Sequence, residues 1–323
     1  MLKIVSSDEQ VNRFARENDT DTIASVVLLG EFLESHPVDY LFSIVNHRIL
    51  PAALLGKAKK NAINYHDGPL PRYAGLNATF WALLNGETAH GITWHQMEAG
   101  IDTGGILQQE WVAIEPDETS FSLNIKCYEA ALRGFAKLTE NLTAQVPPVC
   151  QNPEHRSYYG GDKRLPHGGV VSWQAGAELI GRLYRASSFG FYRNALGLPK
   201  IAVGHALVLV GGVAVSGTLS ATPPGTLVAA TDDCLTVSTS TKDILIRQVT
   251  TLDGKPLAIL QWLAAHGLQP GSVLAEMDAT LLERIEALDV LTARKMDGEL
   301  QKTRQGLTYA LDLAMRYPNL RPT

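Results

Sequence analysis

The chain has 323 residues, 45% of them apolar and 19% charged, which is the composition of an ordinary globular protein. Its length exceeds that of one typical domain, so two domains are expected. The 28 basic and 33 acidic side chains leave a net charge of −5, which provides no general electrostatic attraction for nucleic acid.

The sequence shows no membrane-directed segment. The amino terminus lacks a basic head followed by a long apolar core, so no secretory signal is visible. The longest apolar run, residues 206–215, is too short to span a bilayer. We therefore expect a cytoplasmic protein without a membrane partner. Cys127, Cys150 and Cys234 form no CxxC pair, so neither a disulfide framework nor a zinc site is predicted.

Strand-like and helix-like segments alternate at the start of the chain, which predicts a mostly parallel sheet covered by helices. A strand over residues 2–5 precedes a capping box at Ser7–Gln10, which opens a helix to about Glu17. Residues 38–45 are apolar and β-branched enough for a buried central strand, and residues 62–65 form a second one.

The pattern continues through the rest of the first domain, residues 1–146. Residues 79–84 predict a helix, and residues 91–97 and 106–112 predict strands. Residues 120–144 have apolar side chains mostly at helical spacing and predict a long amphipathic helix. The first domain is thus predicted to have an α/β, Rossmann-like fold.

Proline and glycine become frequent over residues 147–169, where we expect a linker. Residues 170–262 contain short strand segments separated by Gly, Pro and Asp, which predict a small OB-like β-barrel. These segments are 206–210, 225–229, 235–238 and 244–249, preceded by a helix at about 174–186. Residues 263–323 are expected to be a helical tail, either a linker toward a following module, which we favour, or a capping segment.

Three polar side chains stand beside turn residues. Asn64 and His66 follow a buried strand, at the carboxyl end where open α/β sheets place their ligand crevices. Asp102 lies in a tight glycine-containing loop. An isolated Asn-x-His is often structural and an isolated Asp-x-Gly is usually a turn, so each signal alone is weak. Their combination indicates a catalytic site.

These residues belong to three motifs that resemble those of the 10-formyltetrahydrofolate-dependent formyltransferases. The motifs are Asn64-x-His66, Leu70-Pro71-Arg72-x-x-Gly75 and Gly91-x-Thr93-x-x-x-Met97-x-x-Gly100-x-Asp102-x-Gly104-x-Ile106. The resemblance extends from about Ser6 to about Ile259, and the second domain resembles the carboxy-terminal barrel of methionyl-tRNA formyltransferase. Residues 40–46, 64–67 and 91–95 are most similar to formyltransferase domains of nonribosomal peptide synthetases.

The resemblance implies 10-formyltetrahydrofolate as co-substrate and no metal. The implied acceptor is the amino group of an amino acid, either free or loaded as a thioester on a carrier protein of an adjacent synthetase module. The residues implied to bind the folate are Asn46, Leu70, Pro71, Arg72, Gly75, Gly100, Thr103 and Gly104. For Arg72, contact with folate and contact with solvent are equally open. His47 is expected only to neighbour the folate loop, and His90 and His95 are expected to be structural.

The chemistry explains why these residue types are required. Formyl transfer to an amine passes through a tetrahedral carbon bearing an oxyanion, so preorganised donors at that oxygen accelerate it. Asn64 offers an amide N–H and His66 a second donor. The amine must also lose a proton, which requires a base or relay. Asp102 is the candidate, either orienting His66 or passing the proton through water.

One departure concerns the start of the chain, because the family has a strand, a glycine turn and a helix before the segment that begins here at Val5. Either the true start lies upstream, or the domain is damaged, or residues 2–5 replace the missing strand.

Three alternative functions stay open. Loss of the first strand would leave a catalytically weak docking or scaffold domain, which is one alternative function. A second is methionyl-tRNA formyltransferase, disfavoured by the low charge and the absence of a basic loop near residues 18–22. A third is hydrolysis of the formyl folate.

Overall fold

The computed structural model describes residues 2–6, 13, 22–23, 26–46, 48–190, 194, 196–203, 206–278, 280–283 and 287. The chain divides into two compact units. Unit 1 contains residues 1–82, 87–116 and 122–160, and unit 2 contains residues 83–86, 117–121 and 161–323. Apart from Arg13, the predicted helix over residues 7–17 lies outside the described residues, as do His47 and the tail beyond residue 287.

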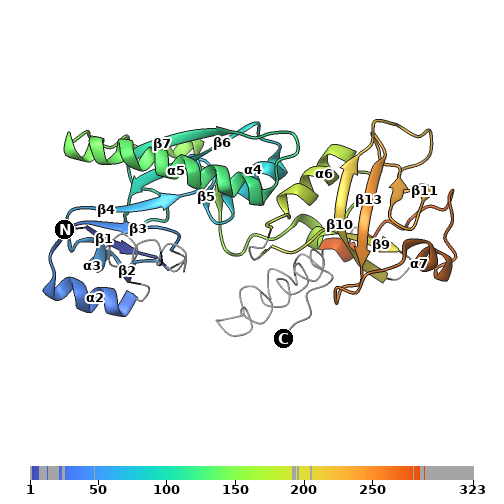
Figure 1. The fold of residues 1–323 in the computed structure, drawn as a ribbon, viewed down its shortest axis with the longest axis horizontal. Coiled ribbons are helices and arrows are strands. Elements are labelled where there is room, and N and C mark those ends of the chain that lie inside the picture. Colours follow the sequence, from blue (N-terminus) through green and yellow to red (C-terminus); the bar gives the residue numbers. More distant parts are fainter. Residues whose placement is uncertain are drawn as a thin grey trace. The chain divides into compact units, whose positions relative to one another are not determined.

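Unit 1 is built on a six-stranded sheet with the order β2-β1-β3-β4-β6-β7 (Figure 1). Its strands are β1 (Leu2–Val5), β2 (Thr22–Ile23), β3 (Val38–Ser43), β4 (Ala58–His66), β6 (Ala89–Gln96) and β7 (Ile106–Ala113). The pairs β1–β2, β1–β3 and β3–β4 are parallel, whereas β4–β6 and β6–β7 are antiparallel. The predicted Rossmann-like α/β architecture is confirmed.

Strand β1 occupies an interior position, because it pairs with β2 on one side and with β3 on the other. Its register with β3 runs from Leu2 opposite Tyr40 to Val5 opposite Ser43. Such a strand has no open edge within the sheet. Residues 2–5 therefore form an inner strand of the sheet.

Alternation along the strands divides the core of unit 1 between the two sheet faces. Leu41 and Ala62, opposite each other on β3 and β4, pack in one cluster with Leu29 and Leu33 of α2 (Val26–Ser35). On the other face, Trp94 donates its indole N–H to the carbonyl oxygen of Ala131, 3.3 Å away, in α5 (Ser120–Thr143). Further short elements of the unit are α3 (Ala52–Leu55), β5 (Ala74–Gly75) and β8 (Tyr158–Tyr159); α4 (Ala78–Asn85) spans the division between the units.

Unit 2 contains a five-stranded antiparallel sheet with the order β11-β12-β13-β10-β9. Its elements are α6 (Ala177–Ala186), β9 (Lys200–Val203), β10 (Ala206–Val215), β11 (Leu227–Ala230), β12 (Leu235–Val237), β13 (Ile244–Thr250) and α7 (Ile259–Ala265). The predicted strands are present, and β9 is an additional one. Among the helices within the described ranges, none is long and apolar enough to cross a bilayer.

The core of unit 2 extends past residue 262, the expected end of the barrel domain. Ile259, Trp262 and Leu263 of α7 pack in one buried cluster with Trp173 and the strands, and Leu274 joins the same cluster. The backbone after α7 also bonds to the start of β11. The Gly271 N–H donates to Leu227 O, and the Leu227 N–H donates to Ser272 O. Residues 263–274 therefore belong to this packed unit.

Substitution of Trp262 tests that packing. Trp262 is 8% exposed, whereas Leu260 on the same helix is 44% exposed. We expect Trp262→Ala to lower the free energy of unfolding of unit 2 by about 3–5 kcal/mol, and Leu260→Ala to change it by less than about 1 kcal/mol. Urea denaturation followed by far-ultraviolet circular dichroism measures both. Equal effects would show that α7 does not pack as described.

Candidate active site

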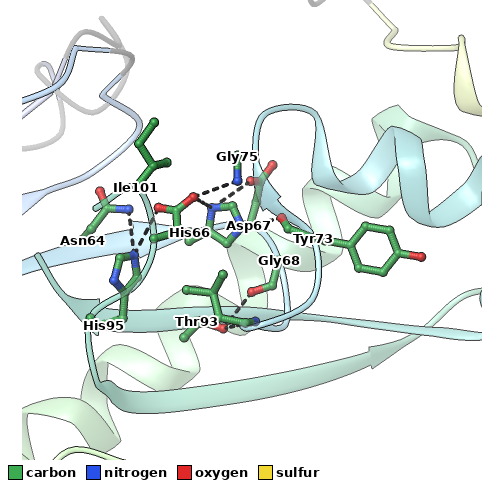
Figure 2. Close-up of polar contacts among 12 residues, drawn as sticks. Asn64, His66, Asp67, Gly68, Tyr73, Gly75, Thr93, His95 and Ile101 are labelled. Carbon is green, nitrogen blue, oxygen red and sulfur yellow. Dashed lines mark hydrogen bonds and ion pairs between the residues drawn. The ribbon is translucent and has the colours of Figure 1, made fainter. Parts of the chain in front are cut away.

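The candidate catalytic residues are assembled by the antiparallel pairing of β4 with β6. Asn64 lies directly opposite His95, and His66 lies directly opposite Thr93. Residues two apart on a strand share a face, and opposed residues have close Cβ atoms. All four side chains therefore lie together on one face at the end of β4, as Figure 2 shows. The intervening residues, Tyr65 and Trp94, are likewise opposed and contact each other on the other face.

The carboxylate of Asp102 enters this group from the loop between β6 and β7. Its Oδ2 accepts a hydrogen bond from the Gly75 backbone N–H at 2.8 Å and lies 3.7 Å from His66 Nδ1. Its Oδ1 lies 3.5 Å from His95 Nε2. The structure therefore brings together Asn64, His66 and Asp102, with the carboxylate of Asp102 close to the rings of both His66 and His95.

Asp102 is 11% exposed in its side chain, so its charge depends on its neighbours. Burial raises the pKa of this carboxyl, whereas the charge of His66 and the hydrogen bond from the Gly75 N–H lower it. The pKa of Asp102 is consequently held well below its usual range. The group is a carboxylate at every pH at which the folded protein would be assayed.

His66 uses both ring nitrogens within the protein. Nε2 lies 2.8 Å from the carbonyl oxygen of Tyr73, an acceptor, so Nε2 carries a hydrogen. Nδ1 faces two carboxylates, Asp102 at 3.7 Å and Asp67 at 3.9 Å. With 5% of its side chain exposed, His66 is held in one orientation beside Asp102.

The Asp102 loop is supported by two residues from the segment expected to be a linker. Gln151 donates from Nε2 to the carbonyl oxygens of Asp102 and Gly104, at 3.0 and 2.7 Å. Arg156 donates to those of Asp102 and Ile101, at 3.2 and 2.8 Å. Asp102 adopts φ of 52°, a left-handed conformation that costs energy for a non-glycine residue. The hydrogen bonds from Gln151 and Arg156 hold the backbone of Asp102 in this conformation.

Thr93 fixes the turn that follows His66. Its hydroxyl donates to Gly68 O at 2.7 Å and accepts from Leu70 N–H at 3.1 Å and from Gln109 Nε2 at 2.9 Å. Thr93 is fully buried. The turn between β4 and Leu70 is thus attached to the neighbouring strand, so His66 cannot move independently of β6.

The residues predicted to bind folate surround this group. Asn46 follows β3, whose Ser43 pairs with Asn64, so its loop lies at the same sheet edge. The Asn46 side chain donates to Arg48 O at 3.0 Å and accepts from Arg48 N–H at 3.1 Å, which shapes that loop. Leu70 is buried, and Arg72 forms an ion pair with Glu87 while part of its side chain stays exposed to solvent.

The glycines of the motifs allow close backbone approach. A Cβ on Gly75 would lie 2.2 Å from Tyr159 O, one on Gly104 would lie 2.0 Å from Gln96 O, and one on Gly100 would lie 2.5 Å from Thr103 Oγ1. These three positions therefore have a packing reason to be glycine. Contact of Asn46, Leu70, Pro71, Arg72, Gly75, Gly100, Thr103 and Gly104 with folate remains a prediction.

The other two histidines differ from each other. Burial lowers the pKa of His90, and its Nε2 lies 2.7 Å from Asp67 O, which suits a neutral structural histidine. His95, which was also expected to be structural, contacts both Asn64 and Asp102. The described residues include no group of three or more His, Cys, Asp or Glu side chains arranged to hold a metal ion.

The comparisons with known proteins identify the family of this chain. Two family models match the chain, "Formyl transferase" over residues 17–139 and "Formyl transferase, C-terminal domain" over residues 166–267, and together they cover more than half of it. The chain belongs to the formyltransferase family. The family recognised from the motifs is thus confirmed.

Curated relatives include the GDP-perosamine N-formyltransferases of Brucella melitensis and Brucella abortus. Each is 33% identical over 159 residues, which are 49% of this chain and 60% of the relative. The chain therefore spans less than two thirds of the length of the curated relatives that it matches.

Solved structures share the fold at lower identity. HypX from Aquifex aeolicus, determined in complex with tetrahydrofolic acid, is 17% identical with a TM-score of 0.61, over 86% of this chain and 50% of that one. The N-formyltransferase from Helicobacter canadensis, in complex with folinic acid and dTDP-3-aminofucose, is 18% identical with a TM-score of 0.60, over 76% and 98%.

Gly75→Ala tests the link between the Gly75 backbone and Asp102. Gly75 has φ of +99° and no room for a Cβ, whereas Gly267 has φ of +65° with nothing within 4 Å of a Cβ. We expect Gly267→Ala to cost about 1 kcal/mol from backbone strain alone, and Gly75→Ala to cost at least about twice as much. Denaturant titration measures both, and similar losses would contradict the close packing at Gly75.

The charge of Asp102 predicts a pH dependence of stability. Because its folded-state pKa lies below the ordinary value of 3.8, its ionised form stabilises the fold fully above that value and progressively less below it. The difference in unfolding free energy between the unsubstituted protein and Asp102→Asn should be constant above about pH 5. Below about pH 4 it should shrink by up to about 1.4 kcal/mol per pH unit.

Urea titrations between pH 3 and 7 provide the measurement. Glu154→Gln serves as the control, because Glu154 is an exposed carboxylate. Its difference from the unsubstituted protein should vary little over this range. A difference for Asp102→Asn that stays constant down to pH 3 would show that the folded protein does not depress the pKa of Asp102.

Proposed function

We propose that this chain transfers the formyl group of 10-formyltetrahydrofolate to the primary amine of an amino acid, either free or loaded as a thioester on a carrier protein. The observation that carries the proposal is the convergence of Asn64, His66 and Asp102 at the carboxyl end of β4. The family assignment supports the transfer reaction. The amino acid acceptor rests on the resemblance of the motif segments to formyltransferase domains of peptide synthetases.

The donor set fits a formyl group. Asn64 has two amide hydrogens and donates one of them toward His95 Nε2, at 3.2 Å, which leaves the other for a ligand oxygen. Asp102 supplies a carboxylate 3.7 Å from His66. The loop after β3, with Asn46, and the motif segments 70–75 and 100–104 are proposed to line the folate subsite. When bound, the folate would supply an activated formyl carbon.

Asn64 would act on the formyl oxygen. As the amine nitrogen bonds to the formyl carbon, negative charge gathers on that oxygen, and the free Asn64 N–H donates to it. His66 is proposed as the second donor when Nδ1 carries a proton, since that nitrogen faces the same region as Asp102. Both side chains are held by hydrogen bonds, so little reorganisation is needed during the reaction.

The low pKa of Asp102 refines its role. A strongly depressed pKa makes a carboxylate a weak base, so Asp102 is better suited to orient His66 and a water than to keep the amine proton. The proton then passes to the leaving nitrogen of the folate as the bond between that nitrogen and the formyl carbon breaks. The reaction requires no covalent bond to the protein.

A nucleotide-linked amino sugar is the second candidate acceptor. The 33% identical relatives are GDP-perosamine N-formyltransferases, and their matched region covers about half of this chain. A tRNA acceptor is disfavoured by the net charge of −5, because tRNA binding depends on neutralising phosphates. The complete group of three catalytic candidates disfavours a docking or scaffold domain.

An acceptor panel discriminates among these functions. The protein is incubated with 10-formyltetrahydrofolate and, separately, free amino acids, carrier-bound aminoacyl thioesters, amino sugar nucleotides and methionyl-tRNA. Mass spectrometry detects a gain of about 28 Da, the mass difference expected of formylation. Formylation of amino acids or thioesters alone supports the proposal, and formylation of sugar nucleotides alone replaces it with the second candidate. Formate release without transfer indicates hydrolysis, and no reaction favours the scaffold.

Asn64→Ala tests the catalytic role of the amide. We expect kcat to fall by about 10²–10³, the usual cost of losing one oxyanion donor, with little change in unfolding free energy. Asn61→Ala, three residues earlier on β4, is the control, because the Asn61 side chain accepts a hydrogen bond from Gln96 Nε2 and contacts none of the three catalytic candidates in the geometry described above. Retention of kcat by Asn64→Ala would contradict the mechanism.

A further inference from the structure

We infer that His95 is a positioning residue for formyl transfer, which sets the orientation of the Asn64 amide by accepting one of its two hydrogens. This inference rests on the proposed function for its kinetic meaning. Its structural content is separate, since it assigns a tautomer and a hydrogen bond to a buried histidine. No motif in the sequence identifies His95 for this role.

The backbone aims His95 at the site. His95 is 2% exposed and lies directly opposite Asn64 across the β4–β6 pair. On its other side, the register of β6 with β7 shifts between Trp94 and His95, so that Trp94 faces Gln108 while His95 faces Ile106. Irregularities of this kind bend a strand and redirect a side chain, and they are frequent beside active sites.

The hydrogen bonds of His95 define its tautomer. Nδ1 lies 2.8 Å from Gln96 O, which can only accept, so Nδ1 carries a hydrogen. Nε2 lies 3.2 Å from Asn64 Nδ2 and 3.5 Å from Asp102 Oδ1. A neutral ring accepts from Asn64, whereas a protonated ring donates to Asp102, and one nitrogen cannot do both. The shorter distance assigns the neutral ring that accepts from Asn64.

This assignment has a consequence for the amide. An asparagine can turn by 180° and exchange its oxygen and nitrogen, since both ends have similar size. If it did so here, the Asn64 oxygen would face the lone pair of His95 Nε2, which is repulsive. The bond to His95 therefore keeps the nitrogen end in place and leaves the second N–H of Asn64 available. Its orientation is fixed before any ligand binds.

Two substitutions separate positioning from simple space filling. The side chain of Gln places its terminal atoms near the position of histidine Nε2, whereas that of Asn reaches only the position of Nδ1. If His95 acts through Nε2, His95→Gln should keep kcat within about fivefold, and His95→Asn should lower it by about 10²-fold, as expected for a displaced catalytic group. KM for 10-formyltetrahydrofolate and for the acceptor should change by less than about threefold in both variants. Retention of kcat by His95→Asn, equal losses of kcat in both variants, or a loss confined to KM would overturn the inference.

A spectroscopic measurement keeps the inference testable if the variants fold poorly or if the proposed function fails. Nitrogen-15 resonances of the histidines are recorded in the unsubstituted protein and in Asn64→Ala, and the His95 signals are assigned. We expect Nδ1 to be protonated and Nε2 to be unprotonated, with the Nε2 resonance shifting toward that of a free acceptor in Asn64→Ala. A protonated Nε2, or a resonance unaffected by Asn64→Ala, would overturn the inference. A protein inactive with every acceptor in the panel contradicts the proposed function alone.

Discussion

The antiparallel register between β4 and β6 is the constraint on which the site depends. It places Asn64 opposite His95 and His66 opposite Thr93, so that four polar side chains share one face. A shift by one residue would move all of them to the other face of the sheet. There Tyr65 and Trp94 pack against each other, and Trp94 bonds to α5. The same register therefore specifies the hydrophobic core and the polar site.

A buried carboxylate then joins strands to loops. Asp102 receives the Gly75 N–H from the loop that follows β4 and stands between the rings of His66 and His95. Removing a charge from water is unfavourable unless donors and opposite charges compensate it. At Asp102 this compensation comes from backbone and side chains far apart in the sequence. The Asp102 charge is therefore stabilised only when the strands and loops of the site are folded together.

The sequence predicted the parts of this arrangement that depend on local pattern. Alternation and apolar runs identified β3, β4, β6 and β7, and turn residues beside Asn64, His66 and Asp102 identified the catalytic candidates. Pairing between distant segments is not visible in such patterns. The direction in which β6 runs beside β4 decides that His95 meets Asn64. Because this direction is not visible in the sequence, the sequence predicts only a structural role for His95. Gln151 and Arg156 lie among prolines and glycines typical of a linker, and only tertiary contacts reveal their role.

The bonds from Gln151 and Arg156 have a consequence for how this chain can be divided or fused. A fragment ending at residue 146 would contain Asn64, His66 and Asp102 but lack the four hydrogen bonds that hold the backbone around Asp102. During synthesis, that loop gains its support only after residue 156 has left the ribosome. The structural boundary of unit 1 thus lies more than fifty positions beyond Asp102, and any exchange of this unit should preserve the chain to about residue 160.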